Sequence, residues 1–189
     1  MLRKISTFDG VFIALMAACG LALKPIVGPL FKLIGSALFI SGGSMAGFIY
    51  MIWPMLAVLV VGRFGAATLV GLIQGAVILV TGIYGSHGVL TLITYTVPGL
   101  VVDIFYQLIR HWQNPWVITV PAAMGNLSGN LLVSILILHL PRIPLLISII
   151  PAVIFGGLGG YLSWLLYNWL LAIFPIFSPA KSNDSTLEH

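Results

Sequence analysis

The clearest shortage in this sequence is of charged residues. Only 6% of its 189 residues are charged, and the acidic side chains number four against eight Lys and Arg. Because a soluble domain carries roughly a quarter charged residues, this composition excludes a water-soluble fold. Hydrophobic residues make up 60% of the chain, and the mean hydropathy is +1.14. We therefore expect a single transmembrane domain over residues 1–186, with residues 187–189 resembling the remnant of an expression tag.

Motifs for catalysis, metal binding and ATP hydrolysis are also missing. The sequence has no phosphate-binding GxxxxGK[ST] loop, no HxxH pair and no Cys/His cluster, and its one cysteine, Cys19, excludes an internal disulfide. The ionisable groups are too far apart to form an acid–base or nucleophilic site. Basic residues are scattered singly, which argues against nucleic-acid binding. We expect a protein that is not an enzyme and that holds neither a cofactor nor a metal.

Long unbroken apolar runs are the main feature that the sequence does contain. They predict an all-α fold, an integral membrane bundle of six transmembrane helices, because helices satisfy their own backbone hydrogen bonds in lipid. The expected spans lie near 7–23, 44–61, 66–84, 88–109, 116–138 and 144–174.

The basic residues then predict how the bundle is oriented. An even number of spans places both termini on one side of the membrane, and more Lys and Arg fall on that side than on the other. Both termini are therefore expected in the cytoplasm. The residues on the two sides are Arg3, Lys4, Arg63, Arg110 and Lys181 against Lys24, Lys32 and Arg142.

Residues 24–43 interrupt the pattern of spans. Lys24-Pro25, Gly28-Pro29 and Ser41-Gly42-Gly43-Ser44 flank or break an apolar core, Leu30 to Ile40, that is too short to cross a membrane. We predict an interfacial or re-entrant segment on the outer side. It is either a lid over a binding site or a connector that rests on lipid headgroups.

The first span carries four small residues at spacings of four, namely Gly10, Ala14, Ala18 and Ala22. They share one helix face, and such faces let two helices approach closely in lipid. The partner is either another helix of this chain or a separate membrane subunit.

The fifth span carries a polar stripe of Asn126, Asn130 and Ser134, with Gly125 and Gly129 before the two asparagines. Asparagine in hydrocarbon is costly unless it is paired, so the stripe should face the bundle interior. Its amides either contact a ligand or form hydrogen bonds between helices.

A turn with an imidazole and a phenol, Tyr84-Gly85-Ser86-His87-Gly88, precedes a span that contains Thr91, Thr94 and Tyr95. With Trp53, these groups could form an aromatic wall with a few hydrogen-bonding atoms, as in small-molecule pockets. Tyrosine and tryptophan also gather at membrane interfaces, so each has a second explanation. His87 is the strongest single candidate. The predicted substrate-binding residues are His87, Tyr84, Tyr95, Thr91, Asn126, Asn130 and Trp53.

Asp103 is the only acidic residue in the interior of a predicted span, because Asp9 lies at the very start of the first one. A buried carboxylate needs a partner, and Arg63, Arg110 and Gln74 are the expected ones. We favour a structural role for Asp103 over a role in proton transfer.

Taken together, these features resemble the substrate-binding S components of energy-coupling factor (ECF) transporters, the vitamin importers of prokaryotes. The resemblance covers nearly the whole chain, including the alanine-spaced first helix, the apolar connector after it and the very short loops. The stretch from Met45 to Asp103 is similar to the branch labelled as cobalt or thiamine-precursor permeases, the YkoE-like group. The motifs in it are Trp53-Pro54, Gly62-Arg63-Phe64-Gly65-Ala66-Ala67, Tyr84-Gly85-Ser86-His87-Gly88 and Pro98-Gly99-Leu100-Val101-Val102-Asp103.

The resemblance implies a high-affinity capture subunit in a prokaryotic cell membrane, which works with a separate T component and two cytoplasmic ATPases. Ala14, Ala18 and Ala22 would dock onto the T component, and the ligand would bind among the outer halves of helices four to six. A thiamine-pathway pyrimidine or a cobalamin precursor is the favoured substrate, although no complete ligand-contact set of one vitamin aligns. The alternative is a stand-alone proton-coupled carrier or channel.

Overall fold

All regular secondary structure is helical in the part of the chain that the computed structural model describes, residues 6–37, 42–82, 88–109 and 114–174. This confirms the all-α prediction. The helices are α1 (Thr7–Ala37), α2 (Gly42–Tyr50), α3 (Ile52–Val61), α4 (Ala66–Thr81), α5 (Leu90–Ile109), α6 (Pro115–Leu136) and α7 (Arg142–Ile173).

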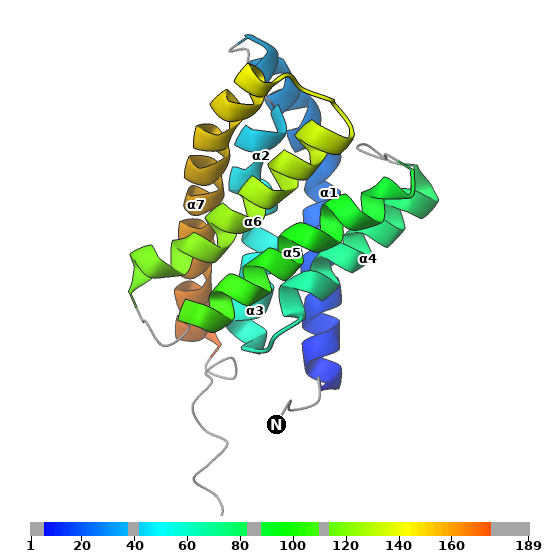
Figure 1. Ribbon diagram of the computed structural model, residues 1–189. Helices are drawn as coiled ribbons and strands as arrows, with labels where there is room; N and C mark the ends of the chain where they lie inside the picture. Colours follow the sequence, from blue (N-terminus) through cyan, green and yellow to red (C-terminus); the bar gives the residue numbers. More distant parts are fainter. Residues whose placement is uncertain (1–5, 38–41, 83–87, 110–113, 175–189) are drawn as a thin grey trace, which may run out of the picture.

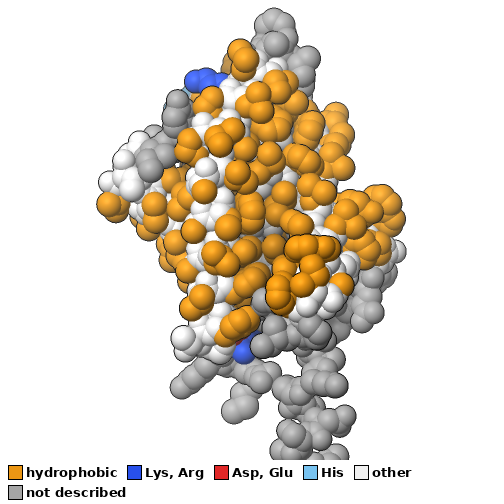
Figure 2. Space-filling view, turned by 180° about the vertical axis from the view of Figure 1, so that it is seen from behind, with side chains coloured by type: hydrophobic (Ala, Val, Ile, Leu, Met, Phe, Trp, Pro, Cys, Tyr) orange, Lys and Arg blue, Asp and Glu red, His pale blue; other side chains and the backbone are white. Residues whose placement is uncertain are grey.

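Five segments of the described chain are long and apolar enough to cross a membrane. They are Thr7–Gly35 of α1, Gly43–Val61 across α2 and α3, and the whole of α5, α6 and α7. With the shorter apolar helix α4, they match the six predicted spans in order. Figure 2 shows one face of the bundle covered almost entirely by hydrophobic side chains, with Lys and Arg only near its two ends. The chain is a multi-pass membrane protein.

The prediction that residues 24–43 form a separate segment after the first span is wrong over the described residues, while the choice between a lid and a connector stays a prediction. Residues 24–37 continue α1 as one helix of 31 residues, with Pro25 and Pro29 inside it. Prolines are tolerated in membrane helices where neighbouring groups satisfy the freed backbone atoms. Lys24 and Val27 are buried on the same face of α1 as Ile13. This face therefore packs against the bundle on both sides of Pro25. Residues 38–41 lie outside the described residues.

The helices form a single bundle with a simple order of neighbours. α4, α5, α6 and α7 follow one another side by side, while α1 packs against α2 and α4 (Figure 1). The α2–α3 segment packs against both α1 and α7.

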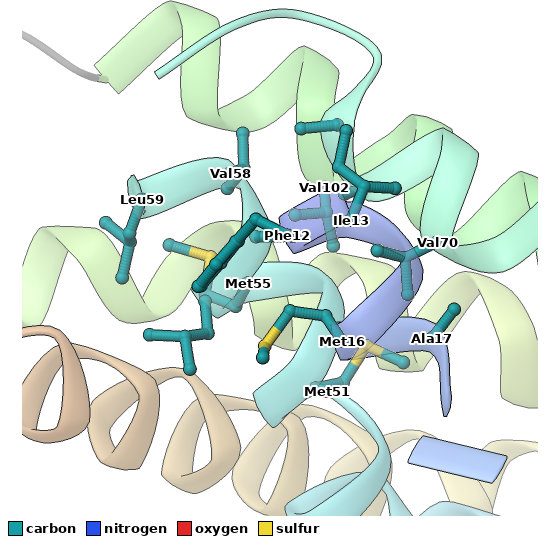
Figure 3. Close-up of a cluster of buried hydrophobic side chains, with 14 of the residues drawn as sticks. Phe12, Ile13, Met16, Ala17, Met51, Met55, Val58, Leu59, Val70 and Val102 are labelled. Carbon is teal, nitrogen blue, oxygen red and sulfur yellow. The ribbon is translucent and has the colours of Figure 1, made fainter. Parts of the chain in front are cut away.

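An apolar cluster holds α1 to the α2–α3 segment. Ile13 and Met16 of α1 meet Met55 and Val58, and Val102 of α5 closes the cluster from the side (Figure 3). All five side chains are less than one tenth exposed. Because the hydrophobic effect does not drive helices together in lipid, this close fit stabilises the bundle mainly through van der Waals packing.

Asp103 joins α5 to the start of α4. Its carboxylate accepts hydrogen bonds from the backbone N–H groups of Ala67 (3.2 Å) and Thr68 (2.8 Å) and from the Thr68 hydroxyl (2.6 Å). The first N–H groups of a helix have no partner within the helix, and the helix dipole there favours a negative charge. The carboxylate therefore caps α4.

The expected partners of Asp103 differ from the observed ones. Arg63 pairs with Asp9, with an N–O distance of 2.9 Å, and the Gln74 side chain donates to the Ala17 carbonyl (3.4 Å). Arg110 lies outside the described residues. The start of a helix provides backbone N–H donors, so a carboxylate there needs no charged side chain as its partner. Hydropathy does not reveal which helix start lies beside Asp103.

We expect Asp103→Ala to lower the free energy of unfolding by about 2 kcal/mol, because it leaves buried N–H groups of α4 without an acceptor. Thermal unfolding in detergent measures the loss. Asp103→Asn keeps one acceptor oxygen and should lose less, and Asp9→Ala, which breaks a partly exposed ion pair, should lose less still. An unfolding temperature equal to that of the wild type in Asp103→Ala would show that the cap contributes nothing.

Candidate functional site

A cavity of about 940 Å³ opens between α1, α2, α4, α5 and α6. Small-molecule sites usually measure about 300–1,000 Å³, so this one can hold an organic ligand of vitamin size. Its polar and small lining residues come from all five helices. They include Lys24, Gly28 and Lys32 of α1, Gly43, Ala46 and Tyr50 of α2, Gly71 and Gln74 of α4, Thr94, Tyr95 and Gly99 of α5, and Asn126, Gly129 and Asn130 of α6.

The cavity lies in the half of the bundle away from the N-terminus. Its walls include the second half of α1, the length of α2 and the second half of α6, which meet at that end (Figure 1). Met51, Ala67 and Val70 belong both to the cavity lining and to the apolar cluster. The packed core therefore closes the inner end of the cavity.

The structure brings together three of the predicted substrate-binding residues. Tyr95, Asn126 and Asn130 line the cavity, whereas Thr91 and Trp53 do not. The Thr91 side chain is fully buried, and Trp53 packs beside Gly20, with its indole N–H buried and without a hydrogen-bond acceptor among the described residues. Tyr84 and His87 lie outside the described residues.

The amides of the polar stripe connect helices. The Asn130 carbonyl oxygen accepts from the Ser44 hydroxyl (2.7 Å), and its nitrogen donates to the Ser148 hydroxyl (2.8 Å). The nitrogen of Asn126 donates to the backbone carbonyls of Ser44 (3.0 Å) and Ala152 (2.8 Å). Of the two explanations for the stripe, hydrogen bonding between helices is therefore observed. The same bonds fix α2, α6 and α7 around the cavity, which both asparagines also line.

Lys24 is the main site residue that sequence reasoning missed. The charge pattern predicts Lys24 on the outer side of the membrane, beyond the first span, but it lies inside α1, is only 6% exposed and lines the cavity. Its ammonium nitrogen lies 3.5 Å from the centroid of the Tyr95 ring and 5.3 Å from that of Tyr50. These are cation–π contacts.

A signal for Lys24 was present in the sequence. It follows Ile13, Ala17 and Gly20 at helical spacings of four, three and four, and all four residues are buried. Extending the first span by one more turn would have placed Lys24 on the inner face. The two prolines, at positions 25 and 29, concealed this continuation.

The small-residue ridge of α1, defined as Gly10, Ala14, Ala18 and Ala22, is exposed along its whole length. A Cβ atom added at Gly10 would meet no atom within 4 Å. Packing of the ridge within this chain is therefore not observed over the described residues. The ridge leaves room for a helix of another protein to approach closely.

Comparison with known families gives one match. A family model described as "ABC-type cobalt transport system, permease component" matches residues 8–128, which is more than half of the chain. No curated protein and no solved structure matches the chain. The matched stretch runs from α1 into α6 and so includes Lys24, Tyr95 and Asn126.

Proposed function

Because the chain belongs to the family of permease components of ABC-type cobalt transport systems, and is thus a membrane transporter component, we propose that it is the substrate-capture S component of an ECF-type importer. One observation carries this proposal. A cavity of ligand size and an uncovered ridge of small residues lie on successive parts of the same helix, α1. One part of the helix would hold the substrate and the other would dock a partner.

The partners in this proposal supply motion and energy. The sequence has no GxxxxGK[ST] loop, so ATP hydrolysis would come from two separate ATPase subunits. A transmembrane T component would dock at Ala14, Ala18 and Ala22. With both termini in the cytoplasm of a prokaryotic cell, the cavity would face the outer half of the membrane.

A small organic nutrient fits the cavity better than a bare metal ion does. Within the described residues, no group of three or more His, Cys, Asp or Glu side chains could hold a metal. Neither Asp9 nor Asp103 lines the cavity, whereas the buried Lys24 does, and its charge would repel a divalent cation. Aromatic rings and amides suit a flat organic molecule, so we propose a vitamin or a vitamin precursor as the substrate.

A stand-alone proton-coupled carrier is the competing function. It would need Asp103 to gain and lose a proton along a path open to water. Asp103 is instead fully buried, caps α4 and does not line the cavity. These contacts favour a capture subunit over a proton carrier.

Two experiments test the proposed function: detection of a bound small molecule on the purified protein, and measurement of its uptake into cells. We expect native mass spectrometry to detect a small molecule bound to the wild type, and we expect the T component and ATPases to copurify. Val133→Trp should lose the ligand, because Val133 lines the cavity and an indole would occupy part of its volume. Ala172→Trp, at an exposed position on α7, serves as the matched control and should keep the ligand. Uptake that continues after deletion of every ATPase partner would contradict the proposal.

A further inference from the structure

The Lys24 side chain lines the cavity and is only 6% exposed, and its ammonium group has no counterion in the described part of the chain. Of the four acidic residues, Asp9 pairs with Arg63 and Asp103 caps α4, while Asp184 and Glu188 lie outside the described residues. No carboxylate and no hydrogen-bond acceptor among the described residues contacts Lys24, which rests on the rings of Tyr95 and Tyr50.

An unpaired charge on a buried side chain is costly in free energy. Ionisable residues within membrane helices nearly always pair with another group, and they mark the paths and sites of substrates. Cation–π contacts recover about 2 kcal/mol when they are desolvated, which is less than the several kcal/mol that burying an ammonium group costs. The cavity beside Lys24 is the place from which a compensating negative charge can come.

We propose that Lys24 binds a carboxylate of the transported molecule, and that the substrate is a small organic acid with an apolar or aromatic body. This inference rests on the proposed function and narrows its substrate class. A cationic or uncharged molecule, such as thiamine or its pyrimidine precursor, would leave the charge of Lys24 uncompensated.

The charge balance favours a carboxylate over a phosphate. Among the described residues that line the cavity, Lys24 is the one buried cation, because Lys32, two turns further along α1, is exposed. One buried positive charge matches the single charge of a carboxylate, whereas a phosphomonoester carries about −1.5 to −2 near neutral pH. The excess charge of a phosphate would be buried without a partner.

The surroundings of Lys24 suit the rest of such a ligand. The Tyr50 hydroxyl lies 3.4 Å from the position that a Cβ atom at Gly28 would take, one turn beyond Lys24. The Tyr50 hydroxyl can therefore donate a hydrogen bond to a ligand group that binds near the Lys24 ammonium. Leu33, Met51 and Val133 provide apolar surface for the body of the molecule.

Matched probes test the inference on the purified full-length protein. The probes are 1-naphthoate, 1-naphthamide and 1-naphthyl phosphate, which share a flat body and differ in the polar group. We expect the wild type to bind naphthoate at least about tenfold more tightly than the amide or the phosphate, since charge-assisted hydrogen bonds are about twice as strong as neutral ones. Thermal stabilisation and titration calorimetry measure the affinities.

Three substitutions identify the group responsible. Lys24→Met keeps the linear side chain but removes the charge, so it should fold and lose the preference for the acid. Lys24→Arg should keep part of that preference. Arg142→Met, which removes a positive charge at an exposed position at the start of α7 and outside the cavity lining, is the matched control and should keep the preference.

Each outcome has a defined meaning. Four results would overturn the carboxylate assignment. They are equal binding of naphthoate and naphthamide, tighter binding of the phosphate, no binding of any probe, and a preference for naphthoate that survives in Lys24→Met. Uptake that depends on the ATPases but carries a substrate without a carboxylate would also overturn it, while leaving the proposed function intact. Conversely, a carboxylate preference together with uptake that needs no ATPase would contradict only the proposed function.

Discussion

Ala14→Trp and Ala18→Trp are expected to abolish transport while leaving substrate binding unchanged. Both alanines are exposed on the small-residue ridge of α1, and no described part of the chain covers them. An indole at either position would hold a docking helix several ångströms away, so the close backbone contact that small residues permit would be lost. Neither residue lines the cavity. Uptake into cells should therefore be lost, while the ligand affinity of the purified variants should equal that of the wild type.

The control for this prediction is the same substitution at another exposed alanine. Ala172 lies near the end of α7, outside both the ridge and the cavity. Ala172→Trp should transport at the wild-type rate, which would show that an added indole does not by itself impair a membrane-exposed face. Normal uptake by both ridge variants would rule out this ridge as the docking surface.

Gly71→Ala should destabilise the protein by about 3 kcal/mol, because overpacking a close contact forces the backbone to shift. A Cβ atom at Gly71 would overlap the backbone carbonyl of Tyr95, which cannot move aside as a flexible side chain can. α4 and α5 would have to separate, and Tyr95 would move relative to Lys24. We therefore expect both a lower unfolding temperature and weaker ligand binding, measured in detergent and by calorimetry.

Gly157→Ala provides a matched control within α7. A Cβ atom there would make one contact of 3.9 Å, with Ala123, which is an ordinary packing distance. Since alanine favours helix more than glycine does, this variant should be neutral or slightly more stable than the wild type. An equal response of the two variants would mean that the α4–α5 contact is not tight.

The same small-residue spacing has opposite consequences on two helices. Gly71 and Gly75 on α4 are four residues apart, and both lie against the backbone of α5. Ala14 and Ala18 on α1 are also four apart, but they are exposed. The spacing predicts a face suited to close approach and does not identify which helix, within or outside the chain, approaches it.

The candidate site shows a similar division. Polarity in an apolar span correctly predicted that Asn126 and Asn130 face the bundle interior, since unpaired polar groups are costly in lipid. That these residues and Tyr95 bind a substrate stays a prediction. Polarity did not predict which groups the asparagine amides bond, namely Ser44 on α2 and Ser148 and Ala152 on α7. Lys24 was misplaced because prolines usually end helices in water, whereas here α1 continues past them.

The sequence alone determined that this is an all-α, multi-pass membrane protein and in which order its apolar segments follow one another. That follows from local properties, because each helix must satisfy its own backbone hydrogen bonds in hydrocarbon and so needs a continuous apolar run. The tertiary structure decided the roles of individual side chains. It placed Lys24 beside Tyr95 in the cavity, gave Asp103 the start of α4 as its partner and left the ridge of α1 uncovered. These roles depend on which helices pack together and on which residues of each helix are in contact. No local sequence pattern specifies either.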